Sequence, residues 1–478
     1  MKTDLAIIGA GPAGMSAARV ASDHGLTVTV LDEQAAPGGQ IYRQPPAEFT
    51  VGNALEGRAY RAGREMVRAA TGDDRVDWRF NTSVCGILRQ HGAEDDSRFR
   101  ILLDRAGACS ELVARQVLVA PGCYDMPVVF RGWNLPGVMA AGGIQAFIKG
   151  QQFVAGERIV FSGSHPLQLI VADQLVQAGG QVGGVYFAQR PVRALAPLRR
   201  PAATLPHLGK LFQAAAALGR LKAAGVPVKF GHTVLEATGT DRLEQVRIAP
   251  IGGDGEVRRD RTQAIDCDRL GICFGFLVNS ELVRQVGADC GWSDRRGGWI
   301  ARHDEWMQTT VPGMFVAGEI TGMAGGEVAA EEGGLAALGC ALEAGRIDRG
   351  RAAEQARAYR QRLRRANRFA RMLCDLAWPG SALFEQLQVD DANLCKCEEV
   401  TAGAFRRMLD EHPHVTTASA AKLLSRAGMG YCQGRYCHFA LTRTLAGLRG
   451  IPAEQVGRFT ARFPARPVPV AHVVDRQD

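Results

Sequence analysis

The first forty residues contain the feature that most constrains the fold, a glycine turn between an apolar run and a helix-forming segment. The apolar run from Leu5 to Ile8 is typical of a buried parallel strand, and Met15 to His24 reads as the helix after the turn. Gly9 allows the tight turn, Gly11 lets the backbone approach a pyrophosphate, and Gly14 lets the helix pack closely on the strand. The helix N-terminus then faces the phosphate charge, which its amides and dipole favour.

A second strand and an acidic residue complete this unit. Leu26 to Leu31 ends at Asp32, eighteen residues after Gly14, where a carboxylate can accept hydrogen bonds from a ribose hydroxyl. Glu33 is the alternative acid. Together, strand, turn, helix, strand and acid predict a dinucleotide site, which includes Pro12 and Ala13 of the turn.

The composition limits the class of protein. A chain of 478 residues with 46% hydrophobic and 22% charged residues is typical of a globular protein of two to four domains. The formal charge is +8, but no basic stripe is interleaved with aromatic residues, so we expect no nucleic-acid partner. There is no apolar run long enough to span a membrane, and the first strand begins by residue 5. We therefore expect a cytoplasmic location and reduced thiols.

Two further segments carry a family resemblance. The segment Pro37-Gly-Gly-Gln40-Ile-Tyr-Arg43 resembles the stretch after this unit in FAD-binding oxidoreductases with two dinucleotide folds. The resemblance implies FAD in the first site, with Gly39 and Gln40 beside it. Val117-Leu-Val-Ala120-Pro-Gly122 resembles the family's Ala-Thr-Gly crossover between nucleotide domains, with a proline replacing the threonine, and so adds Ala120 and Gly122.

The chain returns to the same fold near its middle. The segment from Thr309 to Glu319 resembles the family's late FAD motif, in which a strand delivers a glycine and an acid toward the ribityl and pyrophosphate groups. Gly318 and Glu319 occupy those positions. Glu319 stands where aspartate is commoner, which keeps the charge and lengthens the side chain by one methylene.

A second α/β unit is expected between these FAD segments. Its strands are predicted at Arg158 to Phe161 and Gln181 to Tyr186, with a helix from Leu169 to Gln177. The family carries its NAD(P)H domain here, but His165 replaces the glycine that approaches the pyrophosphate, and Gln168 replaces the packing glycine. We therefore expect a retained fold with an altered site, in which NAD(P) or another adenine nucleotide is a doubtful ligand.

Four cysteines gather near the C-terminal end of the chain: Cys395, Cys397, Cys432 and Cys437. At the average frequency of twelve cysteines in 478 residues, this stretch would hold about one. Four thiolates are the ligand set of a [2Fe-2S] cluster. Structural zinc is the alternative, although its usual cysteine pairs are separated by two to four residues and Cys395-Lys-Cys397 by one.

The quartet resembles the bacterioferritin-associated-ferredoxin type of [2Fe-2S] domain, although that domain commonly has two residues, not four, between the cysteines of the later pair. With the Cys-Gln-Gly-Arg-x-Cys and Pro-Gly-Gly-Gln-Ile-Tyr-Arg motifs, it resembles the FAD-containing A or alpha subunits of opine oxidases, hydroxyproline or proline dehydrogenases and hydrogen cyanide synthase. The resemblance covers nearly the whole chain.

The resemblance implies an α/β fold with two Rossmann-like dinucleotide-binding domains and a small helical [2Fe-2S] domain. The expected boundaries are 1–135 with 275–378 for the FAD domain, 136–274 for the inserted domain, 385–455 for the cluster domain and 456–478 for an extended tail.

Two functions are consistent with these observations. In the first, the chain is the electron-transfer subunit of a hetero-oligomeric amino or imino acid dehydrogenase, and its partners are a small ferredoxin-like subunit and a second flavoprotein subunit. Opine, D-hydroxyproline, proline and glycine are all compatible substrates. In the second, the chain is a self-sufficient NAD(P)H-dependent FAD oxidoreductase. A flavin disulfide reductase is not expected, because Ile41, Tyr42 and Arg43 follow Gln40 in place of a cysteine pair.

Overall fold

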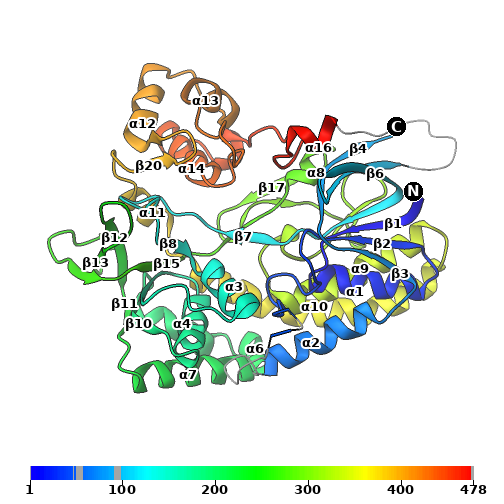
Figure 1. The fold of residues 1–478 in the computed structure, drawn as a ribbon, viewed down its shortest axis with the longest axis horizontal. Coiled ribbons are helices and arrows are strands. Elements are labelled where there is room, and N and C mark those ends of the chain that lie inside the picture. Colours follow the sequence, from blue (N-terminus) through cyan, green and yellow to red (C-terminus); the bar gives the residue numbers. More distant parts are fainter. Residues whose placement is uncertain (1, 47, 50–57, 91–97, 475–478) are drawn as a thin grey trace.

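The computed structural model describes residues 2–46, 48–49, 58–90 and 98–474. Two α/β units are joined through the chain, and a smaller helical unit near the C-terminal end shares a core with the second of them (Figure 1). No helix within the described residues is both long and apolar enough to cross a membrane.

The first sheet contains the predicted strand that precedes the glycine turn. Its order is β3-β2-β1-β6-β5-β4, and β19 also pairs with β6. One part of the sheet is parallel and consists of β3, β2, β1, β6 and β19. The other part is an antiparallel meander formed by β4, β5 and β6. The bounds are β1 Lys2–Ile8, β2 Val28–Leu31, β3 Val76–Arg79, β4 Thr82–Arg89, β5 Phe99–Arg105, β6 Ala108–Val119 and β19 Met314–Val316.

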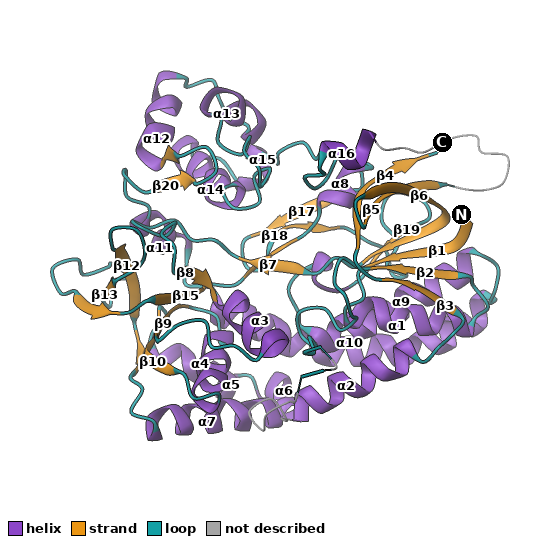
Figure 2. Ribbon diagram, viewed as in Figure 1, coloured by secondary structure: helices purple, strands orange, loops and turns teal. Residues whose placement is uncertain are grey.

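Strand β1 is buried on both faces, as a continuous apolar run predicts. Leu5 and Ile7 belong to the core shared with the helices, and Ala6 and Ile8 to the core shared with the meander. The face of the sheet that carries Leu5 and Ile7 is covered by the helices α1 Pro12–Asp23, α9 Gly326–Glu343 and α10 Arg349–Ala377. Helix α2 Arg58–Thr71 lies beside α1 (Figure 2).

Helices α1 and α9 approach each other closely because Gly333 has no side chain. A Cβ at Gly333 would lie 2.0 Å from the carbonyl oxygen of Ala13. The N-terminal halves of both helices are therefore held at one end of the sheet, beside the glycine turn.

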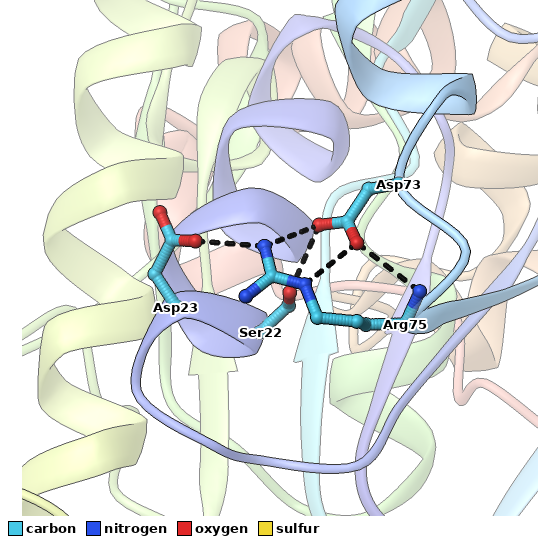
Figure 3. Close-up of polar contacts among 4 residues, drawn as sticks. All are labelled: Ser22, Asp23, Asp73 and Arg75. Atoms are coloured by element: carbon cyan, nitrogen blue, oxygen red, sulfur yellow. Dashed lines mark hydrogen bonds and ion pairs between the residues drawn. The ribbon is translucent and has the colours of Figure 1, made fainter.

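An exposed polar network fixes the other end of α1. Arg75 donates to Asp73 and to Asp23, and Ser22 donates to Asp73 (Figure 3). The hydrogen bond from Arg75 lowers the pKa of the Asp73 carboxyl to about 2. Because more than half of the Arg75 side chain is exposed, the pairs contribute little stability and serve mainly to orient the turn before β3.

The second sheet is parallel, with the order β11-β10-β9-β15-β8. Its strands are β8 Val138–Ala140, β9 Arg158–Gly163, β10 Gln181–Phe187, β11 Val228–Phe230 and β15 Arg269–Cys273, with α3 Ala141–Gln151, α4 Leu167–Gln177 and α7 Leu208–Ala223 as its main helices. A separate antiparallel sheet contains β12 His232–Thr238, β13 Gln245–Pro250 and β14 Gln263–Asp266. The domain boundaries themselves stay a prediction.

Two short antiparallel pairs lie between the sheets and the C-terminal unit. They are β7 Cys123–Asp125 with β16 Phe276–Val278, and β17 Cys290–Ser293 with β18 Gly298–Ala301. The C-terminal unit contains α11 Ser381–Leu387, β20 Asn393–Cys395, β21 Val400–Thr401, α12 Ala402–Glu411, α13 Ala418–Ser425, α14 His438–Arg449 and α15 Ala453–Val456.

Side chains cap two of these helices. Thr401 accepts from the Ala404 amide and Thr417 from the Ala420 amide, which satisfies N-terminal donors of α12 and α13. The expectation of a wholly extended tail is wrong, because Val470–Val474 forms the helix α16, which contacts β6. His472 of this helix binds Asp104 of β5, so a tertiary contact orders the segment.

Candidate nucleotide and cysteine sites

The glycine turn between β1 and α1 has the predicted geometry. Gly9 has φ +102°, and a Cβ there would lie 2.2 Å from the Ala120 carbonyl oxygen. A Cβ at Gly14 would lie 1.8 Å from the Gly9 carbonyl oxygen, so both glycines are required by the protein's own packing. At Gly11 the nearest atom is the Gly39 Cα, 4.0 Å from the Cβ position. The protein therefore leaves space at Gly11, where the pyrophosphate of a dinucleotide would lie.

The N-terminus of α1 is open to an anion. Gly11 is its N-cap residue, Pro12 follows at the first helical position, and among the described residues no side-chain cap is formed at this end. Unpaired amides at a helix N-terminus bind phosphate oxygens well. Pro12 and Ala13 are buried within the turn. The residues present therefore fit a dinucleotide pyrophosphate.

The two acids after β2 have different environments. The Asp32 carboxylate accepts from the Ala10 amide at 2.6 Å and from the Gln34 amide at 2.7 Å. Burial raises the pKa of Asp32. Glu33 is exposed and forms an ion pair with Arg466 from the C-terminal tail. Asp32 thus braces the glycine turn, and a tail residue lies at the predicted ribose end.

The segment from Gly38 to Arg43 lies across the glycine turn. The Gly38 amide donates to the Ala10 carbonyl at 2.9 Å, and a Cβ at Gly39 would lie 3.0 Å from the Gly11 Cα. Gln40 is exposed. The sequence motif therefore forms the opposite wall of the turn, with Gly39 facing Gly11.

The later FAD-like motif also reaches this end of the first sheet. The Ala120 amide donates to the Ile8 carbonyl at 2.8 Å, and Gly122 adopts φ +73°. Gly318 lies at the start of the short helix η4 (Gly318–Thr321), where a Cβ would lie 3.3 Å from the Ala13 Cβ. The structure therefore brings the first and last predicted segments together.

The Glu319 carboxylate does not extend freely into this site. It accepts from the Gly325 amide at 2.9 Å and from the Ala324 amide at 3.1 Å. Both amides immediately precede α9. Burial raises the pKa of Glu319. The carboxylate orders the loop before α9, whose N-terminus has no side-chain cap.

Glu332 of α9, which sequence reasoning missed, holds the backbone at Gly318 in place through hydrogen bonds. Its carboxylate accepts from the Gly318 amide and from the Thr321 hydroxyl, each at 2.9 Å. Burial raises the pKa of Glu332 to about 7.

Asp125 and Lys149 are two further half-buried charged residues that the sequence did not reveal. Asp125 accepts from the Gly142 amide at 3.1 Å, and burial raises its pKa to about 6. Lys149 donates to the Ile41 carbonyl at 3.1 Å, and burial together with the nearby Arg43 lowers its pKa to about 8. Helix α3 therefore links the second sheet to the 41–43 segment of the first site.

The second glycine turn is filled by side chains. A Cβ at Gly163 would lie 2.0 Å from the Cys273 carbonyl oxygen, so this glycine is required by packing. The His165 ring packs edge-on against Phe276 at 5.0 Å, and burial lowers the His165 pKa to about 4. Gln168 is fully buried. A neutral imidazole thus stands where the approach glycine of a dinucleotide site would be.

The four C-terminal cysteines lie in two pairs, and each pair joins one cysteine of the 395–397 segment to one of the 432–437 loop. The Cys395 thiol contacts that of Cys437, and the Cys397 thiol contacts that of Cys432. The hydrogen bond with Cys437 lowers the pKa of Cys395 to about 6, and the Gly428 amide donates to the Cys395 sulfur at 3.5 Å.

Cys395 and Cys437 are buried, whereas Cys397 is exposed. The described residues include all twelve cysteines of the chain, and no disulfide links any of them. Within the described residues, no group of three or more His, Cys, Asp or Glu side chains is arranged to hold a metal ion. The cluster assignment therefore stays a prediction.

Comparison with known proteins identifies the family. The model of the family described as pyridine nucleotide-disulphide oxidoreductase matches residues 3–345. The HcnB subunit of hydrogen cyanide synthase from Pseudomonas aeruginosa is 33% identical over 97% of this chain and 96% of its own. The A subunit of opine oxidase from Rhizobium meliloti strain 1021 is 30% identical over 99% of this chain and 98% of its own.

A solved structure supports the same fold. L-proline dehydrogenase from P. horikoshii superimposes with a TM-score of 0.69 at 20% identity, covering 98% of this chain and 78% of that one. The predicted α/β class with Rossmann-like sheets is confirmed. The chain belongs to the pyridine nucleotide-disulphide oxidoreductase family and is an FAD-dependent oxidoreductase.

Proposed function

We propose that the chain is the FAD- and [2Fe-2S]-containing electron-transfer subunit of a cytoplasmic, hetero-oligomeric dehydrogenase of amino or imino acids. The observation that carries the proposal is the convergence of Cys395 with Cys437 and of Cys397 with Cys432 in a chain that also has an open glycine turn. The two features supply sites for a two-electron and a one-electron carrier.

The FAD site is formed by the segments that meet around Gly11. The first amides of α1, including those at Ala13 and Gly14, would hold its pyrophosphate, and Gly39 forms the facing wall. Asp32 holds the turn in shape, and Glu33, which is paired with Arg466, is the second acid at the ribose end. The remaining members of the site are Gly9, Pro12, Gln40, Ala120, Gly122, Gly318 and Glu319. When bound, FAD supplies two-electron redox chemistry.

The cluster site uses all four cysteines as thiolates. Their unequal exposure means that Cys397 would lie toward solvent, while Cys395 and Cys437 would lie inside. A Cβ at Gly430 would lie 2.5 Å from the Cys397 Cβ, so that glycine lets the two loops meet. Bound there, a [2Fe-2S] cluster transfers single electrons.

The names of the relatives support a role as one subunit of several. HcnB and the opine oxidase A chain are both named as subunits, and this chain covers nearly all of each. We assign as partners a second flavoprotein subunit, which binds the substrate, and a small ferredoxin-like subunit. The substrate belongs to the class of opine, D-hydroxyproline, proline and glycine.

Analysis of anaerobically purified protein tests the cluster. We expect two irons and two acid-labile sulfides per chain, with a rhombic paramagnetic resonance signal after reduction. Stoichiometric zinc without labile sulfide would contradict the electron-transfer role.

Anaerobic addition of NADH tests the alternative function, a self-sufficient NAD(P)H-dependent reductase. The retained β9-α4-β10 order favours that alternative, whereas the half-buried His165 ring in the second glycine turn opposes it. We expect the flavin absorbance to remain unchanged, and prompt bleaching would favour the alternative.

A further inference from the structure

A cavity of about 250 Å³ lies between the second half of the first unit, the cysteine-bearing loop and the tail. It is separate from the glycine turn, since none of the predicted nucleotide-site residues lines it. Most of its lining comes from three segments that are distant in sequence, the 277–299 region, the 428–439 loop and residues 459–465, and Tyr124 and Lys422 complete it. Its volume suits a molecule of about the size of an amino acid, and it is below the usual range for larger ligands.

Aromatic rings form a large part of the wall. Trp292 stacks on Phe439 with ring centres 5.5 Å apart, and Trp299 meets Trp292 edge-on at 5.5 Å. Phe459 and Tyr124 complete this part of the lining. Such a wall favours a flat apolar group, because rings stack or meet edge-on at these separations.

The cavity also contains positive charge without matching acids. Four cationic side chains line it, namely Arg284, Lys422, Arg435 and Arg462, against one acid, Glu281. None of these five residues forms an ion pair within the part of the chain that the structure describes. Arg462 is exposed and the other three cations are half-buried, so it is the net positive charge of the lining that favours an anion in the cavity.

Three buried polar atoms of the lining have no partner among the described residues: Arg284 Nε, Trp299 Nε1 and Glu281 Oε2. Trp299 is only 8% exposed. Arg284 satisfies one other nitrogen by donating to the Phe459 carbonyl at 2.9 Å. Among the residues that line the cavity, two donors therefore lack an acceptor and one acceptor lacks a donor, and a molecule with a carboxylate and an ammonium group would supply the missing partners.

Arg284 and Glu281 belong to the same short helix, α8 (Glu281–Gln285), but do not bind each other directly. Burial lowers the pKa of Arg284, and the charge of Glu281 opposes that shift. The two charged groups are thus near enough to interact while each keeps an unpaired polar atom. A zwitterion could bind both.

We propose that this cavity binds an α-amino acid with a flat apolar side chain. Its carboxylate pairs with Arg284 and Trp299, its ammonium group pairs with Glu281, and its side chain packs on the aromatic wall. The proposal goes beyond the electron-transfer function and does not depend on it. The ligand would also touch Gln433 and Arg435, which lie between Cys432 and Cys437.

Matched probes test the proposal on the purified full-length chain: L-phenylalanine, 3-phenylpropionate, which lacks the amine, and phenethylamine, which lacks the carboxylate. Calorimetry and tryptophan fluorescence report binding, since two tryptophans line the cavity. We expect L-phenylalanine to bind at least tenfold more tightly than phenethylamine, and more tightly than 3-phenylpropionate. Absence of binding at 10 mM by all three, or equal binding of phenethylamine and L-phenylalanine, would overturn the proposal.

Variants locate the binding site. Arg284→Gln should weaken L-phenylalanine binding at least tenfold, and Glu281→Gln should remove the preference for L-phenylalanine over 3-phenylpropionate. Lys222→Gln, on the exposed end of α7, is the control and should leave binding unchanged. Unchanged binding by Arg284→Gln would contradict the assignment. Arg284→Lys guards against misfolding, since it should bind more tightly than Arg284→Gln if the charge is what matters.

Discussion

Gly11→Ala should remove FAD without destabilising the protein. Gly11 has φ −74°, which alanine adopts readily, and its Cβ would meet nothing nearer than the Gly39 Cα at 4.0 Å. The free energy of unfolding of the flavin-free protein should therefore change by less than about 0.5 kcal/mol. The added methyl group would instead occupy the space of the pyrophosphate.

The loss of affinity has a simple cause. The methyl group would push the phosphate away from the backbone amides that donate hydrogen bonds to it. Two hydrogen bonds to a charged group contribute about 1.5–3 kcal/mol each. Losing both weakens FAD binding by about 3–6 kcal/mol, or about 100- to 20,000-fold. Titration of the flavin-free protein with FAD, followed by calorimetry or flavin fluorescence, measures this change. Urea unfolding of the same samples measures stability.

Two other glycines serve as controls. Gly14→Ala places a methyl group 1.8 Å from the Gly9 carbonyl oxygen, so it should lower stability by about 1–3 kcal/mol as well as FAD affinity. Gly219→Ala, within α7, meets no atom within 4 Å and should stabilise the protein by about 0.5–1 kcal/mol with unchanged FAD binding. The reasoning would be refuted if Gly11→Ala bound FAD with a dissociation constant within threefold of the unmodified protein.

Three further predictions concern the other sites. Cys395→Ser should lose the labile sulfide and the paramagnetic signal, because a serine oxygen is a harder ligand than a thiolate, whereas Cys267→Ser should keep both. His165→Gly should improve the binding of NADH or of an adenine nucleotide, measured by calorimetry. A micromolar dissociation constant for NADH and the unmodified protein would contradict the prediction that His165 blocks this site. Burial raises the Glu332 pKa from 4.5 to about 7, so its contribution to stability should be fully present below pH 4.5 and be lost as pH rises through 7. Glu332→Gln should remove up to about 3 kcal/mol of that dependence in urea unfolding, and parallel pH profiles for the two proteins would contradict the burial argument.

The sequence alone determined the local unit that dominates the fold. The apolar run before Gly9, the spacing of the glycines and the acid after the second strand predicted β1, α1 and β2 to within a few residues at each end. It also separated the second turn from the first, because His165 breaks the pattern. These features depend on backbone conformation and on neighbours close in sequence, which a linear pattern encodes.

The tertiary structure decided which partners these residues have. Asp32 binds the Ala10 amide, Glu33 meets Arg466, and Glu319 binds the amides before α9. The sequence assigned all three acids to a nucleotide, since spacing identifies an acid near a turn but not what saturates its oxygens. Likewise, the pairing of cysteines from two loops and the cavity beside Arg284 arise from segments far apart in the chain. Such segments meet only when the hydrophobic core is packed. A pattern of neighbouring residues does not encode these contacts, because each of them depends on the shape of the whole core.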